Sequence, residues 1–332
     1  MKALVLEGLH QPLAIKEVST PSLQPGEVLV QVKAAALNHR DVWIQKGQYG
    51  GIKYPSILGS DGAGVVVEAF SEAEKHWVGK EIIINPSHNW GNNPKGQGKS
   101  FKILGLPDEG TFAQYVKVAT RYLADKPAHL SFEEAAALPL AGLTAYRTLI
   151  SRAQVQKGEK VLITGIGGGV ALFVLQYALA IGAQAYVTSS SEAKIARAKE
   201  MGAIGGTNYT SPDWADELKK QTGGFDVLID SSAGEGFAKL VDIAAVGGRI
   251  AIYGGTQGVI KELVPQRIFW KQLSILGATM GSEEEFGQMV YFIIQHQLRP
   301  VVNKIFPWEE AEQALRRMDN KEQFGKIVLK IE

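Results

Sequence analysis

The chain has 332 residues, more than a single hydrophobic core usually serves, so we expect two domains. Its 35 Lys and Arg residues balance 34 Asp and Glu residues to a formal net charge of +1, which gives no indication of a nucleic acid or an anionic membrane as partner. The absence of Cys excludes disulfide bonds, thiolate nucleophiles and zinc held by thiolates.

The first residues and the apolar stretches indicate where the protein resides. Residues 2–6 form a strand-like segment, and no apolar leader with a cleavage site precedes it. The longest apolar stretches, such as 170–175, are far shorter than a membrane span. We therefore expect a soluble, cytoplasmic protein.

Short β-rich segments dominate the chain up to about Tyr122. Segments such as 28–32 and 64–67 are separated by Gly, Pro and Asn, which predicts a compact, mostly β domain. Ser131, with two glutamates in the turn after it, predicts the N-cap of a helix that leads into the second half.

From Glu159 onward, strands alternate with helices. The predicted strands cover residues 160–164, 185–188, 227–230, 249–253 and 274–277. This alternation predicts right-handed crossovers and a buried parallel sheet, so the fold class is α/β, with a doubly wound Rossmann sheet. An amphipathic helix follows near 308–318, and the chain ends in an alternating strand, 326–331, that could return to the first domain.

A glycine-rich loop at 164–171 lies directly after a strand and directly before a helix. This context suits a pyrophosphate, because glycines let backbone N–H groups approach and the helix N-terminus attracts negative charge. Gly165, Gly168 and Ala171 have the spacing G-x-x-G-x-x-A, whereas Val170 stands at the last position of the stricter G-x-G-x-x-G pattern. The alternative is a flexible turn that binds no ligand. The predicted cofactor contacts here are Gly165, Gly167, Gly168, Gly169 and Val170.

The end of the next strand bears on the choice of cofactor. NAD-selective folds usually carry an acidic residue about twenty positions beyond the loop, but none occurs here before Glu192. Ser189, Ser190 and Lys194 would instead suit a 2′-phosphate, so we predict NADP as cofactor, with NADPH preferred over NADH. For Lys194 the alternative is an ordinary solvated helix face.

Six motifs in order resemble the medium-chain dehydrogenase/reductase superfamily over nearly the whole chain. They are residues 38–41 (Asn-His-Arg-Asp), 57–65, 110–115, 143–146, the loop 165–171 and 324–328. The resemblance implies a GroES-like catalytic domain over 1–122 with 299–332, a Rossmann cofactor-binding domain over 123–298, and an active site in the cleft. Asn38 with Asp41 resembles the zinc-free quinone oxidoreductases, whereas segment 90–112 and the glycine loop are closer to proteins named zinc-type alcohol dehydrogenases.

The same resemblance implies that the catalytic metal is missing. Zinc alcohol dehydrogenases carry Cys where this chain has Asn38, a His-Glu pair at Ser60 and Asp61, and a second Cys near Leu140 or Ala141. Of these positions only Asp61 keeps a plausible ligand, and one carboxylate does not make the three-ligand site of catalytic zinc. We therefore expect no metal.

Hydride transfer without zinc favours activated acceptors. The product anion of a quinone or an α,β-unsaturated carbonyl is delocalised and needs less local stabilisation than that of an aldehyde. The candidate catalytic residues are Asn38, Asp41, Trp43, Tyr49 and Asp61, with Asn38 as hydrogen-bond donor and Tyr49 as possible proton donor. Packing of the aromatic residues and a turn role for Asp41 are the alternatives. A metal-independent alcohol or aldehyde dehydrogenase, and an NADPH-binding structural or regulatory protein with little turnover, are the competing functions.

Further cofactor contacts follow from the resemblance and from the position of ligands at the carboxyl ends of parallel strands. They are His39, Arg40, Thr144, Ser231, Tyr253, Gly254, Gly255, Thr279 and Lys326. For Thr144 a helix cap is the alternative, and for His39 and Arg40 a solvated surface. The segment 273–277 resembles an edge strand that pairs subunits, so we expect a homodimer or tetramer besides the small-molecule carbonyl or quinone substrate.

Overall fold

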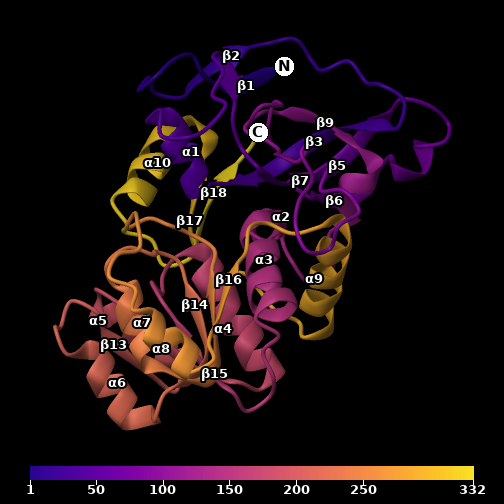
Figure 1. Cartoon of the computed structure of the whole chain (residues 1–332). Coiled ribbons are helices and arrows are strands. Elements are labelled where there is room, and N and C mark those ends of the chain that lie inside the picture. The colour runs from indigo at the N-terminus through magenta and orange to yellow at the C-terminus, as the bar shows by residue number, and fades with distance from the viewer. The chain divides into compact units, whose positions relative to one another are not determined.

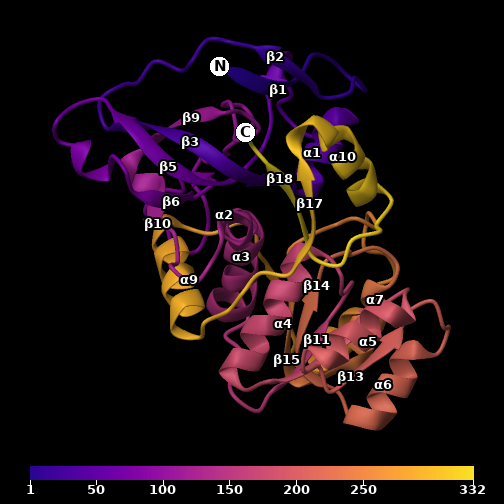
Figure 2. The same ribbon diagram turned by 180° about the vertical axis from the view of Figure 1, so that it is seen from behind.

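The computed structural model describes all 332 residues, which form two compact units (Figures 1 and 2). The first unit comprises Met1–Leu143 and Gly281–Glu332, and the second comprises Thr144–Met280. These compact units change over at 143 and 281, whereas the resemblance implied functional domains bounded at 122 and 299. Those functional boundaries stay a prediction.

The first unit is built on antiparallel β-structure, as its short β-rich segments predicted. Its largest sheet has the order β10 (Leu123–Asp125), β6 (Glu81–Ile84), β5 (Asp61–Ala69), β3 (Glu27–Ala36), β18 (Lys326–Lys330) and β17 (Val302–Pro307), with β9 (Tyr115–Ala119) also on β3. A smaller sheet has the order β2 (Ala14–Glu17), β1 (Lys2–Leu6) and β4 (Ser56–Ile57), and β7 (Ser87–His88) pairs with β8 (Lys102–Ile103).

The C-terminal strand β18 returns to the first unit, as predicted, but its burial differs from the prediction. It pairs antiparallel with β3 and parallel with β17, and helices α2 and α10 contact it. Residues 326–329 are therefore all buried instead of alternating. The reason is that an interior strand is covered on both faces, so even Lys326 is enclosed.

The helices of the first unit are α1 (His39–Gln45), α2 (Phe132–Ala136), α9 (Glu283–Gln295) and α10 (Ala311–Asp319), and α3 (Pro139–Tyr146) begins there. Short η turns cover Lys75–Trp77, Thr120–Tyr122 and Trp308–Glu310. The predicted cap at Ser131 is confirmed: its Oγ accepts the Glu134 N–H at 3.2 Å, and the Glu134 carboxylate accepts the Ser131 N–H at 2.9 Å. Helices α1 and α10 lie side by side (Figures 1 and 2).

The second unit is a six-stranded sheet in which every pairing is parallel. The order is β13 (Gly205–Asn208), β12 (Gln184–Ser189), β11 (Lys160–Ile163), β14 (Phe225–Asp230), β15 (Ala244–Ile252) and β16 (Ser274–Gly277). The helices are α4 (Gly169–Ile181), α5 (Glu192–Glu200), α6 (Trp214–Thr222), α7 (Phe237–Ile243) and α8 (Pro265–Trp270), and a π-helical turn, η3, covers Arg147–Arg152. The order reverses between β11 and β14, which is the switch point of a Rossmann fold. The predicted fold class is confirmed.

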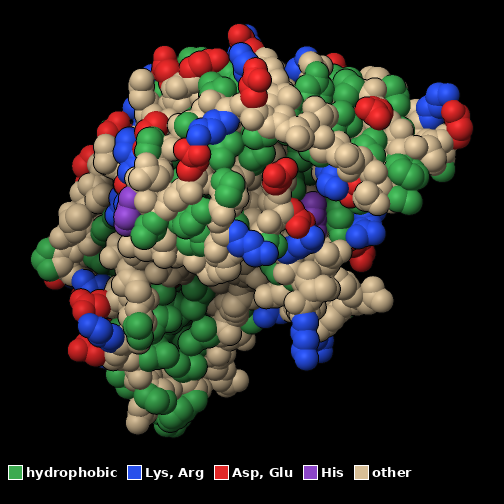
Figure 3. Space-filling model, turned by 90° about the horizontal axis from the view of Figure 1, so that it is seen from above, with side chains coloured by type: hydrophobic (Ala, Val, Ile, Leu, Met, Phe, Trp, Pro, Cys, Tyr) green, Lys and Arg blue, Asp and Glu red, His purple; other side chains and the backbone are tan.

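The surface shows no concentration of one charge on the face drawn in Figure 3, where acidic and basic side chains are interspersed. That pattern agrees with the formal charge of +1. None of the helices combines the length and the apolar character that crossing a membrane requires.

Candidate active site

The first polar cluster lies where α1 begins, beside the central strands of the first unit. Strand register creates it: Ala36 on β3 is paired with Asp61 on β5 and with Val328 on β18. Asn38, two residues beyond Ala36, is therefore brought beside the start of β5 and the start of β18. Three segments that are far apart in sequence meet at this point.

Lys326 is the centre of this cluster. Its Nζ donates to the Asn38 side-chain oxygen Oδ1 at 2.7 Å, to Asp61 Oδ2 at 2.9 Å and to the Leu37 carbonyl at 2.7 Å. The Asn38 amide nitrogen Nδ2 also donates to Asp61 Oδ2, at 2.9 Å. The predicted catalytic residues Asn38 and Asp61 thus lie together, and Lys326, predicted as a cofactor contact, lies between them.

Asp61 also connects this cluster to the start of α3. Its Oδ1 accepts the Leu140 backbone N–H at 2.8 Å, so both carboxylate oxygens have donors. The Asp61 side chain is fully buried and that of Lys326 is 4% exposed. Two buried charges are tolerated only when they are paired and hydrogen-bonded, which is the arrangement found here.

Asp41 lies one turn into α1 and stabilises the start of this helix. Its Oδ2 accepts the Asn38 backbone N–H at 2.8 Å, while its Oδ1 is buried without a hydrogen-bond partner. Burial raises the pKa of Asp41 from 3.8 to about 6, although the nearby Arg40 opposes this shift. Asp41 is therefore easier to protonate than an ordinary aspartate.

Arg40 and Tyr49 contact each other through a hydrogen bond and through the face of the tyrosine ring. The Arg40 Nη1 donates to Ser60 Oγ at 2.6 Å and to the Leu104 carbonyl at 2.8 Å, and its Nε donates to the Tyr49 hydroxyl at 3.3 Å. The guanidinium also lies 5.0 Å from the centre of the Tyr49 ring. Arg40 is thus bonded inside the first unit, and its contact with a cofactor phosphate stays a prediction.

His39 and Trp43 are neighbours on α1, with ring centres 6.1 Å apart. Burial, together with the nearby Lys326 ammonium, lowers the pKa of His39 from 6.5 to about 4, so this imidazole is neutral at pH 7. A neutral imidazole can donate to or accept from a ribose hydroxyl, but it offers no charge to a phosphate. The roles predicted for both residues remain to be tested.

The glycine loop of the second unit has the form that a pyrophosphate needs. Gly165 and Gly167 have φ values of +66° and +123°, which side chains rarely adopt. A Cβ at Gly165 would come within 2.7 Å of Ser231 Oγ, and one at Gly167 within 2.9 Å of Lys194 Cδ. Helix α4 begins directly after the loop, with Gly168 at its N-cap. The loop fits a dinucleotide phosphate, and the Lys194 side chain lies against it.

Asp230, which the sequence analysis did not single out, organises the strand ends around this loop. Its Oδ1 accepts the Thr164 hydroxyl at 2.8 Å, and its Oδ2 accepts the Ala233 N–H at 2.7 Å. The predicted contact Ser231 follows it, with its N–H donated to Thr164 Oγ1 at 3.0 Å. An acidic residue that ends a buried Val-Leu-Ile run was the available signal, because such a charge needs several donors.

The remaining predicted cofactor residues lie at other points of the second unit. Ser189 ends β12, and its Oγ accepts the Ser191 N–H at 3.2 Å, with Ser190 between them. Tyr253, Gly254 and Gly255 follow β15, and a Cβ at Gly254 would meet the Ser231 carbonyl at 2.5 Å. Val170 lies in the first turn of α4, and Thr279 follows β16. Thr144 lies within α3, with its Oγ1 3.9 Å from the Met280 sulfur, and does not cap that helix.

Comparison with known proteins identifies the family. An alcohol dehydrogenase GroES-like domain matches residues 24–128, and a zinc-binding dehydrogenase domain matches residues 169–295. The zinc-type alcohol dehydrogenase-like protein YogA of Leptosphaeria maculans is 35% identical, over 97% of this chain and 96% of that protein. The chain belongs to the medium-chain, zinc-type alcohol dehydrogenase-like family.

Two further similarities show the range of this family. A crystal structure of an NAD-dependent alcohol dehydrogenase is 37% identical, with a TM-score of 0.92 and complete coverage of both chains. The acryloyl-coenzyme A reductase of Metallosphaera sedula is 28% identical over 99% of each protein. The dehydrogenase is therefore an NAD(P)-dependent oxidoreductase that is similar to both alcohol dehydrogenases and enoyl-CoA reductases.

The residues of this dehydrogenase do not fit the zinc that its family's name implies. At the positions where the resemblance places ligands, Asn38 offers an amide and Ser60 a hydroxyl. The remaining position, Leu140 or Ala141, offers only an aliphatic side chain. Asp61, the one carboxylate, is already occupied by an ammonium and two N–H donors. No three His, Cys, Asp or Glu side chains anywhere in the chain are grouped as a metal site.

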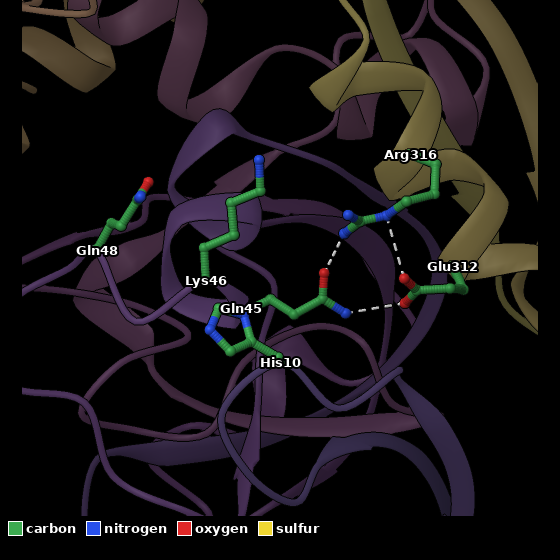
Figure 4. A pocket seen from close by; sticks show the side chains of 6 residues that line it. All are labelled: His10, Gln45, Lys46, Gln48, Glu312 and Arg316. Carbon is green, nitrogen blue, oxygen red and sulfur yellow. Dashed lines mark hydrogen bonds and ion pairs between the residues drawn. The ribbon is translucent and has the colours of Figure 1, made fainter.

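A separate hollow of about 400 Å³ lies at the far end of α1 (Figure 4). It is lined by His10, Gln45, Lys46, Gln48, Glu312 and Arg316. Lys46 forms an ion pair with Asp319, and Arg316 forms one with Glu312, so each of these two basic side chains is paired with a carboxylate. The hollow offers no unbalanced charge to a ligand.

Replacing Asp41 with Asn should change how the stability of the dehydrogenase depends on pH. The folded-state pKa of about 6 lies above the ordinary 3.8, so the contribution of this carboxyl is fully present below about pH 4 and is lost as the pH rises through about 6. The wild-type free energy of unfolding minus that of Asp41→Asn should fall by roughly 1 kcal/mol between about pH 5 and pH 7.5. Urea unfolding of both proteins tests this, and a difference that stays constant with pH would contradict it.

Proposed function

We propose that this dehydrogenase is an NADPH-dependent reductase of activated acceptors, either quinones or α,β-unsaturated carbonyl compounds, and that it works without zinc. The observation that carries the proposal is the cluster of Lys326, Asp61 and Asn38. Two of its members, Asn38 and Asp61, stand where the resemblance places zinc ligands, and the Lys326 ammonium donates a hydrogen bond to both.

The chemistry of the acceptor follows from what the cluster can supply. When bound, the nicotinamide supplies a hydride, and this chain must orient the acceptor, exclude water and stabilise negative charge on the acceptor oxygen. We assign that stabilisation to the Asn38 amide N–H. A quinone or an enone spreads the developing charge over several atoms, so a hydrogen-bond donor serves where a saturated aldehyde would need a Lewis acid.

The relatives support both this proposal and its main alternative. The name of the Metallosphaera reductase specifies an acryloyl thioester, which is an α,β-unsaturated carbonyl compound. The solved NAD-dependent alcohol dehydrogenase supports a second candidate, a metal-independent alcohol or aldehyde dehydrogenase. The substrates that are turned over distinguish the two candidates.

NADPH oxidation by EDTA-treated protein of measured metal content should proceed with a quinone and with an α,β-unsaturated ketone, but slowly with a saturated aldehyde. The reason is the weaker local stabilisation that the delocalised anions require. Activity confined to the aldehyde, or restored only by added zinc, would overturn the proposal. NADPH binding without turnover of any acceptor would instead favour a structural or regulatory role.

The preference for NADPH rests on the charges near the glycine loop. No carboxylate ends β12, where Ser189 and Ser190 stand. The Lys194 side chain lies over Gly167, since a Cβ at that glycine would be 3.4 Å from Lys194 Nζ. We infer that this ammonium contributes to binding of the 2′-phosphate.

Exchanging Lys194 for Glu should weaken NADPH binding by at least about tenfold while changing NADH binding much less, because only NADPH carries the additional phosphate. Fluorescence titration with each cofactor measures the two dissociation constants. Lys199→Glu, an exposed position on the same helix, is the control for charge reversal without contact. Equal weakening of both cofactors by the Lys194 variant would assign that lysine to the pyrophosphate instead.

We also propose that the dehydrogenase forms a homodimer or tetramer through the edge of its parallel sheet. Strand β16 has one neighbour, β15, and so presents an unpaired edge. Phe269 and Trp270, just before it, are 58% and 77% exposed, and Val246 is 77% exposed. Large apolar side chains so exposed are typical of protein interfaces.

Trp270→Glu should lower the molar mass measured by light scattering during size-exclusion chromatography, because a charge at this interface would be desolvated without a partner. Tyr291→Glu changes another aromatic residue, 68% exposed, on α9 and should leave the mass unchanged. An unchanged mass for the Trp270 variant, or a monomeric wild type, would remove this assignment.

A further inference from the structure

The Lys326 ammonium has no hydrogen left for a ligand. It carries three hydrogens, and three acceptors lie within 2.9 Å of Nζ: the Leu37 carbonyl, Asn38 Oδ1 and Asp61 Oδ2. A direct bond to substrate or to cofactor phosphate would require one of these to break. Lys326 therefore acts through another group.

The two charges determine which way the Asn38 amide points. An ammonium can only donate, so the amide oxygen Oδ1 faces Lys326; a carboxylate can only accept, so Nδ2 faces Asp61. A flipped amide would set its NH₂ group against the ammonium and its oxygen against the carboxylate. One Nδ2 hydrogen is used on Asp61, and the second is held in a defined direction.

Asn38 has a second role besides the one that its position in the helix favours. It is the N-cap residue of α1, and an Asn there commonly uses its side-chain oxygen to accept an N–H of the first turn. Here the Asp41 N–H is donated to the Asn38 backbone carbonyl at 2.9 Å, and the side-chain oxygen accepts from Lys326. The side chain is thus bound to the ion pair in addition to its capping-box arrangement with Asp41 at the start of α1.

We propose that Lys326 is a positioning residue, the cationic end of a hydrogen-bond relay that runs from its ammonium through the Asn38 amide to the oxygen of the acceptor. The ammonium polarises the amide carbonyl, which makes the remaining N–H a stronger donor. The charge of Lys326 thus acts on the acceptor oxygen through the intervening Asn38 amide, whereas a metal ion would contact that oxygen directly. This inference rests on the proposed function, in which Asn38 binds the acceptor oxygen.

The decisive variant removes both buried charges at once. Lys326→Met together with Asp61→Asn leaves no unpaired charge in the interior, which favours folding. The relay predicts that kcat for the quinone falls on the order of 100-fold while its KM stays within about threefold. NADPH dissociation constants, measured by fluorescence, should stay at the wild-type value. A loss of NADPH affinity would show that Lys326 is a cofactor contact, and an unchanged kcat would show a purely structural role.

A double-mutant cycle with Asn38→Ala tests whether the lysine acts through the amide. Asn38→Ala should lower kcat by a similar factor, and adding the two charge-removing changes should then have little further effect, because the relay is already broken. Multiplicative losses would overturn the relay. Lys326→Arg, which keeps the charge, gives a second cycle with Asn38→Ala if the charge-free variant does not fold.

Failure of the inference is distinguishable from failure of the proposed function. The wild type is first assayed with quinone, enone and aldehyde, and the cycle is then run on whichever acceptor is turned over. If only the aldehyde reacts, the proposed function is wrong, but non-additive losses would still support the relay. If no acceptor reacts, the relay is overturned, since it has no catalytic step to serve.

Discussion

A buried ion pair between Lys326 and Asp61 requires the central strands of the first unit to pair in one particular register. Their side chains are 4% and 0% exposed, so neither charge could remain in the interior without the other. The two residues are 265 positions apart, and they meet because β18 and β5 are both hydrogen-bonded to β3. The C-terminal strand therefore completes both the sheet and the polar cluster, which links the stability of this unit to the chemistry at the start of α1.

In the second unit, too, a buried carboxylate with several hydrogen-bond donors holds distant segments together. Its parallel strands end together at one edge, where backbone groups and glycines must leave room for a phosphate. Asp230 accepts hydrogen bonds from Thr164 and Ala233, which ties the turns after β11 and β14 to each other. One buried carboxylate thus organises each unit: Asp61 fixes an amide donor, and Asp230 fixes the loops beside the glycine-rich turn.

The candidate site was predictable in part, and the limits have physical causes. Asn38, Asp41 and Asp61 could be named because they stand in motifs whose order resembles a known family. Lys326 could be named as well, as a cofactor contact, because it stands in the motif 324–328. Its burial was not predicted. The lysines at 326 and 330 suggested a strand with one exposed face, whereas this strand is covered on both faces and Lys326 is buried. Asp230 was missed for a related reason, since its donors come from turns that the strand itself does not specify.

The sequence by itself determined the features that depend on neighbouring residues. These are the β-rich first half, the alternation of strands and helices after Glu159, the glycine loop between a strand and a helix, and the lack of thiol ligands. The period of the apolar residues and the conformational freedom of glycine act over a few positions, so they can be read locally. Tertiary structure alone decided the partner of Lys326, the direction of the Asn38 amide and the raised pKa of Asp41. Each depends on strand register, which brings together groups that are distant in the chain and removes them from water.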